Sequence, residues 1–346
     1  MPTTVDVEVT NRCNAKCHFC PRDRTPHQGL MPPDVYAKAL ERAVEYRARV
    51  AELPDPNVHI SLCGLGEPLL NRHVIDYVRQ GRAEGFFVKM SSNASLLDER
   101  RSAALLEAGL QQILINVGEE GDDYEEIYQL PFERTLENVV RFNEMAGDAC
   151  QVTMVIVDHR ADPDHVAHMK KYWSDRGIPH ALSYEIMNRG GSLFVEHMQY
   201  GGYPEQAVAL ARLQGELNGA LCAAPFLYLF VGYDGQYYLC CSDWEKQAPL
   251  GSIFDNSFVD VVGRKIEHVR SREPVCRTCN LDPLNKLTDE IRAEAAGQAP
   301  PGSSDALVHS IATETSLARL AAAALGQHVP DVDLRKARRY IPVASL

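Results

Sequence analysis

The sequence lacks the features that mark membrane-spanning and nucleic-acid-binding chains. Its 346 residues include 35 Lys and Arg against 47 Asp and Glu, which gives a formal net charge of −12. A chain this acidic has no basic surplus for phosphate groups, so nucleic acid and anionic membranes are excluded as its main partners. No apolar run reaches the ~18 residues of a membrane span, and no signal peptide opens the chain. We therefore expect a cytoplasmic protein.

Tryptophan is also scarce, with 2 residues, but the composition is otherwise that of a globular protein. The 45% of apolar residues excludes a disordered chain, and the length suits about two domains of ~150 residues each. Cysteine, by contrast, is abundant at 10 residues. In a reducing compartment, clustered cysteines more often bind metal or perform chemistry than form disulfides.

The first half of the chain alternates strand-like and helix-like segments. Such alternation favours a parallel sheet with right-handed crossovers, either open or part of a barrel. In these folds the chemistry lies in the loops at the carboxyl ends of the strands. The predicted strands are 5–9, 58–62, 86–90, 112–117, 151–157 and 180–186, and the predicted helices begin near Pro33 and span 72–83, 98–108, 132–146 and 163–176.

From about residue 200 the pattern changes. A helix is predicted over 204–219, and two strand-like runs, 227–231 and 236–239, then flank Asp234-Gly235, which is a strong hairpin signal. These features predict a second, smaller unit with antiparallel character. The composition of residues 299–305 indicates a linker, and an Ala/Leu-rich helix with a basic end follows it.

The first cysteine group is Cys13-x3-Cys17-x2-Cys20, directly after the first predicted strand. Thiolates are the usual ligands of iron–sulfur clusters, and four of them close a four-iron cluster. Here the next cysteine, Cys63, is more than forty residues away, so a three-thiolate cluster would leave one iron open, as a catalytic metal requires. A zinc site or three unrelated thiols is the alternative, although structural zinc prefers paired C-x2-C knuckles.

With Phe19 before its last cysteine, this loop resembles the signature loop of the radical S-adenosylmethionine (radical SAM) superfamily. The resemblance implies an α/β fold, a partial (β/α)6 TIM barrel. It also implies a 4Fe-4S cluster on Cys13, Cys17 and Cys20 whose open iron is chelated by S-adenosyl-L-methionine, and a 5′-deoxyadenosyl radical that abstracts hydrogen from substrate. A flavodoxin- or ferredoxin-type electron donor is the expected partner, and Phe19 is expected near the adenine.

Further motifs agree with this resemblance in the right order. Residues 64–68, Gly-Leu-Gly-Glu-Pro, follow the second strand, where the family has a Gly-Gly-Glu-Pro motif that holds the amino group of the cofactor; Leu65 departs from it. Residues 91–94 are similar to the family's Thr-Asn-Gly. Each motif taken singly is more typical of a cap or turn. The cofactor-binding residues that the resemblance implies are Phe19, Gly66, Glu67, Ser92, Asn93 and Asn116.

The second cysteine group comprises Cys222, Cys240, Cys276 and Cys279. Four thiolates on a hairpin and a C-x2-C turn can hold an iron–sulfur cluster or zinc, and spacing alone does not separate the two. The pattern resembles the start of a SPASM domain, and the absence of cysteines after Cys279 resembles the shorter twitch version, with one fully ligated auxiliary 4Fe-4S cluster. The spacing of 17 residues between Cys222 and Cys240 is similar to that of 2-deoxy-scyllo-inosamine dehydrogenase. The implied domains are a radical SAM core (1–200), a linker helix and twitch domain (201–282) and a helical C-terminal extension (283–346).

The auxiliary cluster suggests the reaction. It could accept the electron of a radical formed at a carbinol carbon, which would become a ketone, as the resemblance implies for sugar-alcohol dehydrogenases. We therefore expect an oxidoreductase for a sugar, aminocyclitol or nucleoside in specialised, antibiotic-type metabolism. Arg189 is the candidate donor to substrate oxygen, and the candidate bases are Asp158, His159 and Glu185. Cys241 is a bystander, an alternative ligand or a thiol that returns hydrogen, whereas Cys63 and Cys150 are expected to be buried small apolar residues.

Three alternatives remain open at this stage. The first is a redox-neutral epimerase, lyase or sugar-acid decarboxylase with a structural auxiliary cluster, for which Cys241 would be required. The second is a maturase that crosslinks a ribosomal peptide; we expect this less, because the chain begins directly with the first strand at Val5. The third is an electron-transfer or scaffold protein without catalysis, against which the motifs around Glu67 and Asn93 argue.

Overall fold

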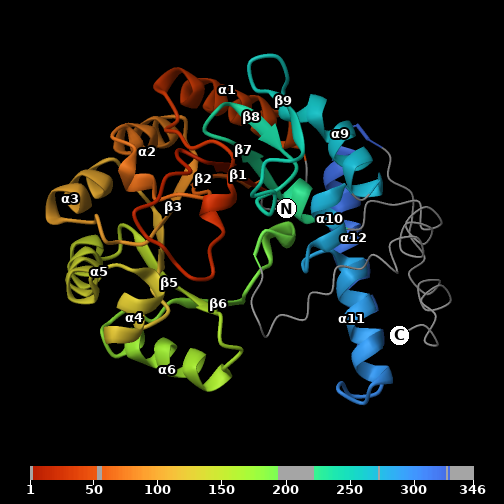
Figure 1. The fold of residues 1–346 in the computed structure, drawn as a ribbon. Helices are drawn as coiled ribbons and strands as arrows, with labels where there is room; N and C mark the ends of the chain where they lie inside the picture. The colour runs from red at the N-terminus through yellow and green to blue at the C-terminus, as the bar shows by residue number, and fades with distance from the viewer. Residues whose placement is uncertain (1–2, 53–56, 194–221, 272, 325, 328–346) are drawn as a thin grey trace.

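A curved nine-stranded sheet frames the molecule (Figure 1). The computed structural model describes residues 3–52, 57–193, 222–271, 273–324 and 326–327. The strand order is β6-β5-β4-β3-β2-β1-β7-β8-β9. The strands are β1 (Thr3–Val7), β2 (Val58–Leu62), β3 (Phe87–Ser92), β4 (Gln112–Asn116), β5 (Gln151–Asp158), β6 (Ala181–Glu185), β7 (Tyr228–Val231), β8 (Gln236–Tyr238) and β9 (Pro249–Ser252).

The strands β1 to β6 are parallel and alternate with helices that cover the outer face of the sheet (Figure 1). This arrangement confirms the predicted partial barrel. The helices are α1 (Pro33–Val50), α2 (Val74–Ala83), α3 (Glu99–Glu107), α4 (Gly121–Tyr128), α5 (Phe132–Ala146) and α6 (Pro163–Ser174), and three 3-10 turns occur at η1 (Arg22–Arg24), η2 (Pro68–Leu70) and η3 (Arg189–Gly191).

The two faces of β1 show how the barrel is built. Val5 and Val7 are 0% and 1% exposed and belong to the apolar core. Each such buried side chain contributes ~1.5–3 kcal/mol. Because side chains alternate along a strand, Asp6 points to the opposite face, into the barrel. There it lies within hydrogen-bonding reach of Ser61 on β2 and of Cys63 just after β2, so the inside of the barrel is polar below the site.

Some boundaries in the barrel differ from the prediction. The strand predicted over 5–9 is β1 at Thr3–Val7. The predicted helix 72–83 begins at Val74, because the Asn71 side chain accepts a hydrogen bond from the His73 backbone and holds a turn there. The helix α4 was missed; its eight residues bury only Tyr124 and Tyr128, too short an apolar pattern to stand out.

The second unit continues the barrel sheet. The predicted hairpin is confirmed: β7 and β8 pair antiparallel across a turn in which Gly235 has a φ of 75°. The unit has the antiparallel character that the sequence predicted, but β7 also pairs in parallel with β1, so the unit belongs to the same sheet as the barrel. Its helices are α8 (Ala224–Leu227), α9 (Phe258–Ser271), α10 (Pro274–Thr278), α11 (Pro283–Ala295) and α12 (Ser303–Ala324).

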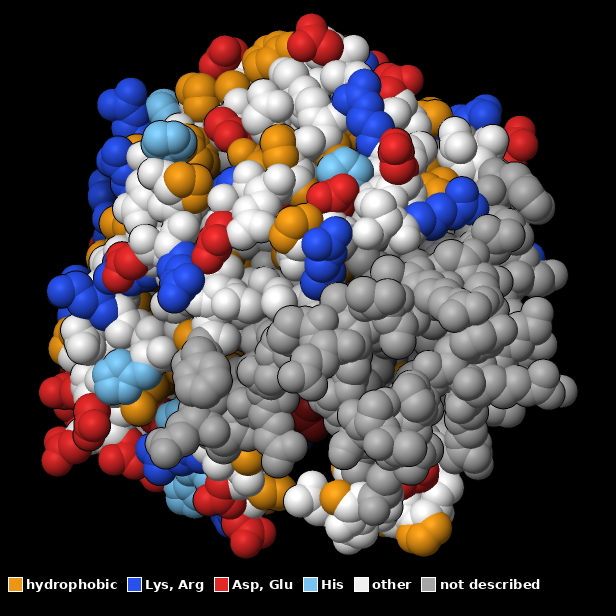
Figure 2. All heavy atoms as spheres, turned by 45° about the vertical axis from the view of Figure 1, so that its right-hand side comes forward, with side chains coloured by type: hydrophobic (Ala, Val, Ile, Leu, Met, Phe, Trp, Pro, Cys, Tyr) orange, Lys and Arg blue, Asp and Glu red, His pale blue; other side chains and the backbone are white. Residues whose placement is uncertain are grey.

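The predicted linker at 299–305 is shorter than expected. The helix α12 begins at Ser303, where Ser303 and Ser304 donate hydrogen bonds to Glu294 of α11. The predicted helix 204–219 and the basic end of the chain lie outside the described residues. Among the residues that are described, we find no helix that could cross a membrane. On the face in Figure 2, acidic and basic side chains of the described residues are interspersed.

Candidate active site

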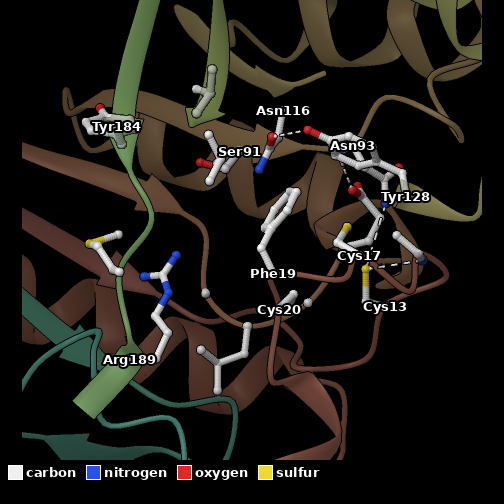
Figure 3. Close-up of a pocket in the computed structure, with 18 of the residues that line it drawn as sticks. Cys13, Cys17, Phe19, Cys20, Ser91, Asn93, Asn116, Tyr128, Tyr184 and Arg189 are labelled. Atoms are coloured by element: carbon white, nitrogen blue, oxygen red, sulfur yellow. Dashed lines mark hydrogen bonds between the residues drawn. The ribbon is translucent and has the colours of Figure 1, made fainter. Parts of the chain in front are cut away.

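A cavity of about 260 Å³ opens where the carboxyl ends of the barrel strands meet (Figure 3). Every strand from β1 to β6 contributes lining residues from its end or from the loop after it. This is the edge where parallel-barrel chemistry occurs. Most of the predicted site residues line it: Cys13, Cys17, Phe19, Cys20, Gly66, Glu67, Ser92, Asn93, Asn116, Glu185 and Arg189.

The loop after β1 brings its three thiols together. The sulfur of Cys13 accepts hydrogen bonds from the Ala15 backbone at 3.4 Å and from the Asn93 amide at 3.8 Å. The Cys20 backbone donates to the Cys17 carbonyl at 3.1 Å, which closes a turn. These hydrogen bonds hold the shape of the loop around Cys13 and Cys17.

Burial raises the pKa of the Cys13 thiol to about 11 and raises the pKa values of Cys17 and Cys20 as well. The charges of Cys20 and Cys13 raise the pKa of Cys17 further, which shows how closely the thiols gather. Arg22 opposes the shift at all three. Three such thiols ionise together only when a cation replaces their protons, so the loop fits an iron–sulfur cluster.

Glu67 fastens the loop after β2 to the end of β3. Its carboxylate is 1% exposed and accepts hydrogen bonds from the backbone of Leu69 at 3.0 Å, the hydroxyl of Ser92 at 2.9 Å and the backbone of Asn93 at 2.7 Å. Burial raises the pKa of Glu67 to about 6, and these three donors act against the rise. In this structure Glu67 therefore organises the cavity wall that the resemblance assigns to cofactor binding.

Two glycines of the same loop are required by close contacts. A Cβ at Gly66 would lie 2.3 Å from the Arg12 carbonyl oxygen, so the loop packs directly on the start of the cysteine loop. Gly64 has a φ of +145° and a Cβ there would lie 2.6 Å from Cγ of Glu8. Leu65, where the family has glycine, uses its backbone N–H to bind Glu8 at 3.2 Å.

The end of β3 is tied to the cysteine loop by amides. The Asn93 side chain donates to Asn14 at 3.0 Å and accepts from the Ser95 hydroxyl at 2.7 Å, and Asn14 in turn donates to Ser95 at 2.8 Å. Ala94 adopts a φ of 59°, the conformation that favours glycine, which is the residue the family has there.

Phe19 is held by aromatic neighbours on one side of the cavity (Figure 3). Its ring centroid lies 5.4 Å from that of Tyr128 and 5.5 Å from that of His159. The Tyr128 hydroxyl donates to Asn116 at 3.1 Å. His159 does not line the cavity, although Phe19 beside it does. Its Nε2 forms a 2.7 Å hydrogen bond with the buried carboxylate of Glu119.

The opposite wall is the segment after β6, from which Arg189 points inward (Figure 3). Its guanidinium lies 5.1 Å from the ring centroid of Trp244, and its backbone takes a left-handed φ of 51°. Glu185 also lines this wall, with an exposed side chain. Asp158 lies outside the lining and accepts a hydrogen bond from the Asp162 backbone in a turn.

The four cysteines of the second group act on one another through their charges. Asp282, Cys240 and Cys279 act on Cys222, and Asp282, Cys240, Cys222 and Cys279 act on Cys276. Burial is the main cause that raises the pKa of each of these thiols. The Asn285 amide binds the carbonyls of Cys276, Arg277 and Cys279 at 3.1, 3.3 and 2.8 Å, which fixes the C-x2-C turn.

This turn is attached directly to the cavity wall. The Thr278 hydroxyl donates to the Gly190 carbonyl at 2.7 Å, and a Cβ at Gly190 would lie 2.3 Å from Val275. Asn188 and Asn280 also exchange backbone–amide hydrogen bonds of 3.0 and 3.1 Å. The wall that carries Arg189 is therefore packed against α10, the helix that carries Cys276.

The remaining cysteines have different surroundings. Cys150 is 2% exposed in the core, as expected. Cys63 is half-buried beside Asp6, so its setting is polar rather than apolar. Cys241 does not line the cavity; burial raises its pKa to about 11, the charge of Asp6 raises it further, and Arg189 acts against the rise.

Sequence reasoning missed several residues of the site. Glu8, at 0% exposed, forms a 3.1 Å ion pair with Lys246 and also accepts the Leu65 backbone hydrogen bond. Trp244 and Tyr128 line the cavity. No pattern in the sequence indicated the ion pair of Glu8, because its partner is 238 positions away.

Comparison with known proteins identifies the two parts. Residues 7–171 match the radical SAM superfamily, and residues 222–280 match the iron–sulfur cluster-binding SPASM domain. The chain carries a radical SAM domain followed by a SPASM domain. The two domains imply S-adenosylmethionine and iron–sulfur clusters as its cofactors.

This chain resembles curated relatives over part of their length. It is 28% identical over 112 residues to a tungsten-containing aldehyde ferredoxin oxidoreductase cofactor-modifying protein of Pyrococcus furiosus, covering 32% of this chain and 29% of that protein. It is 28% identical over 116 residues to a PqqA peptide cyclase of Rhodopseudomonas palustris, covering 34% and 29%. The matched stretch is thus less than a third of each relative.

Solved structures share the fold of this chain. BtrN in complex with AdoMet and 2-DOIA superposes with a TM-score of 0.50 at 15% identity, over 81% of this chain and 93% of BtrN. SuiB of Streptococcus suis bound to its precursor peptide SuiA gives 0.56 at 12% identity, over 82% and 70%. These identities establish a common fold and not a common substrate.

Proposed function

We propose that the enzyme oxidises a carbinol carbon of a sugar, aminocyclitol or nucleoside. Cys13, Cys17 and Cys20 would hold the cluster that binds S-adenosylmethionine, and Cys222, Cys240, Cys276 and Cys279 would hold an auxiliary four-iron cluster. When bound, S-adenosylmethionine on the first cluster would supply a 5′-deoxyadenosyl radical that abstracts hydrogen, and the auxiliary cluster could accept one electron. The proposed domains are 1–200, 201–282 and 283–346, and a flavodoxin- or ferredoxin-type protein is the proposed donor.

The observation that carries this proposal is the shared wall between the cavity and the second cysteine group. The η3 turn presents Arg189 to the cavity on one side and packs Gly190 against Val275 on the other. Arg189 also acts electrostatically on Cys20 of the first group and on Cys241, the neighbour of Cys240 in the chain. A substrate held there would have an electron acceptor directly behind the wall, as an oxidation requires.

The chain's own polar groups on this wall suit an oxygen-bearing substrate. The Arg189 guanidinium would donate to a hydroxyl or carbonyl oxygen of the substrate. Trp244 has a buried indole N–H with no partner in the described part of the chain, and it lines the same cavity. Glu185 would take the hydroxyl proton as the carbonyl forms, because it is the carboxylate on the side of Arg189.

Iron and acid-labile sulfide content after anaerobic reconstitution tests the proposal. We expect about eight irons per chain in the parent protein and about four in a Cys13/Cys17/Cys20→Ala variant, because each site takes one four-iron cluster. A Cys222/Cys276→Ala variant should also hold about four. Cys150→Ala is the matched control and should leave the iron content unchanged, since Cys150 is buried in the core.

A parent protein with about four irons and zinc in the second site would overturn oxidation through that site. The next measurement is product analysis with diol and amino-alcohol substrates, in which the transfer of one hydrogen from the substrate to 5′-deoxyadenosine is followed. A ketone product supports the proposal. An epimer or a fragment formed without net oxidation contradicts it.

A redox-neutral reaction is the second candidate, in which the Cys241 thiol would return a hydrogen atom to the substrate radical. In that case Cys241→Ala would still form 5′-deoxyadenosine but no product. In the oxidative reaction, Cys241→Ala would form the ketone at a rate near that of the parent protein.

A peptide substrate is a third candidate, because two of the similar proteins act on or bind peptides. PqqA peptide cyclase and SuiB bound to its precursor peptide both point to peptide chemistry in those proteins. Isothermal titration with a peptide and with an aminocyclitol separates the two substrate classes. Saturable binding of the peptide alone would replace our proposal.

A further inference from the structure

Lys265 of α9 is a buried lysine that the proposed function does not use. Its side chain is 1% exposed. The ammonium donates to the Pro225 carbonyl at 2.6 Å and to the Leu239 carbonyl at 3.2 Å. Its third N–H has no partner among the residues that the structure describes, and no carboxylate in that part of the chain forms an ion pair with it. A fully enclosed ammonium is thus held by neutral groups only.

Such an arrangement is costly in the chain alone. Burying an ammonium without a counter-charge costs several kcal/mol, because neutral carbonyls replace only part of its hydration. Burial lowers the pKa of Lys265 to about 8, which leaves it protonated at neutral pH. The negative groups that act on it through space are Cys240 first, then Asp6 and Cys241.

The two carbonyls that bind Lys265 belong to the segments that carry the second cysteine group. Leu239 is joined to Cys240 by one peptide bond, and Pro225 lies three residues after Cys222 at the start of α8. The ammonium is therefore fixed near Cys240, whose thiol is the first of the charges that act on it. When Cys240 binds metal it loses its proton, and the missing negative charge then forms next to Lys265.

We propose that Lys265 is the counter-charge of the metal group in the second cysteine site and makes that group easier to reduce. This inference rests on the proposed function, in which the site holds a four-iron cluster. Reduction adds one negative charge, and a fixed cation in a low-dielectric interior stabilises the more negative state. Lys265 is a positioning residue, since it acts on the cluster and does not touch substrate.

A redox titration of the reconstituted full-length chain, followed by electron paramagnetic resonance, tests this role. Lys265→Gln removes the charge but can still donate to both carbonyls, whereas Lys265→Arg keeps the charge. Lys171→Met is the matched control, because Lys171 is 74% exposed on α6. We expect Lys265→Gln to reduce the ratio of reduced to oxidised auxiliary cluster about tenfold at a given potential, equivalent to about 59 mV for one electron.

The first cluster gives an internal reference. Its potential is identified by its loss in the Cys13/Cys17/Cys20→Ala variant and should be unchanged in Lys265→Gln. In Lys265→Arg and Lys171→Met, the ratio of reduced to oxidised cluster at a given potential should stay within about twofold of the parent value for both clusters. Equal potentials in Lys265→Gln and the parent would overturn the inference. Equal shifts in Lys265→Gln and Lys265→Arg would assign Lys265 a structural role and also overturn it.

Variants that do not load iron remain informative. Loading in Lys265→Arg but not in Lys265→Gln would support the counter-charge. If neither variant loads iron and the metal-free variants also lose the circular dichroism signal of the folded chain, Lys265 has a structural role and the inference is overturned. A parent protein whose second site holds no four-iron cluster would refute the proposed function itself, and the iron count distinguishes this case from the others.

Discussion

Asp6 is the residue whose surroundings differ most from those of an ordinary carboxylate. It is 6% exposed inside the barrel. Burial raises its pKa to about 6, although the charge of Lys89 and hydrogen bonds from Cys63 and Ser61 act in the opposite direction. A carboxyl whose pKa is higher in the folded than in the unfolded chain binds its proton more tightly when folded. Folding is therefore favoured at low pH, and this contribution is lost as the pH rises toward 6.

The metal-free chain should show this effect as a pH-dependent stability. We expect Asp6→Asn to be more stable than the parent at pH 7, by at most about 3 kcal/mol, because it removes a buried charge. The difference should shrink through the window between pH 6 and pH 4. Urea unfolding at four pH values across that window measures it.

Asp98→Asn is the control, because Asp98 is a half-exposed cap of α3 whose pKa is lowered, chiefly by the backbone N–H and charge of Arg101 acting against burial. Its change with pH should have the opposite sign. An Asp6→Asn variant less stable than the parent at pH 7 would mean that attraction to Lys89 outweighs burial.

At this scale the sequence predicted residues with a local signature. The cysteine triad and Phe19 lie within one short loop, and Glu67 and Asn93 follow strands at fixed offsets, so all of them could be found by spacing. Trp244 could not, because its role depends on contact with Arg189, which lies far away in the chain. His159 showed no local sign that it would bond to Glu119 rather than line the cavity.

Among the elements, the end of β1 and the loop after β8 are joined by one buried ion pair. Glu8 and Lys246 have side-chain exposures of 0% and 8%, and the ammonium also lies 4.2 Å from the ring centroid of Tyr238. Glu8 holds the Leu65 backbone as well, so the pair links the second unit to the loop after β2. It thereby fixes the loop that contains Gly66 and Glu67.

Removal of either partner should be strongly destabilising. We expect Glu8→Gln and Lys246→Met each to lower the free energy of unfolding by about 3–5 kcal/mol, because each leaves an unpaired buried charge. The double variant should recover part of this loss. Guanidinium unfolding of the metal-free chains measures all three, and additive losses in the double variant would contradict a coupled pair.

Element prediction succeeded where periodicity was long and failed where it was short. The helix predicted over 132–146 is α5 with the same bounds, since its apolar stripe runs for four turns. The eight-residue α4 was missed, and the linker signal of Pro300, Pro301 and Gly302 concealed the start of α12 at Ser303. The parallel pairing of β7 with β1 was beyond prediction, because it joins strands more than 220 residues apart.

Across the whole molecule, the shared sheet should make unfolding a single event. The two tryptophans report on different parts: Trp173 is buried in α6 of the barrel, and Trp244 lies in the second unit beside the cavity. Each of the variants Trp173→Phe and Trp244→Phe keeps one tryptophan. In each variant, we expect the unfolding midpoint followed by tryptophan fluorescence to equal the midpoint followed by circular dichroism. Two separate fluorescence midpoints would show that the β1–β7 pairing does not couple the units.

The position of β1 between β2 and β7 also constrains how such enzymes diversify. Recombination that exchanged the carboxyl-terminal half with that of a relative would have to preserve the register of Thr4 with Tyr228 and of Asp6 with Phe230. It would also have to supply a lysine for Glu8. Exchange of either half would thus disturb the sheet register and the buried ion pair, whereas changes in the loops around the cavity would leave both intact.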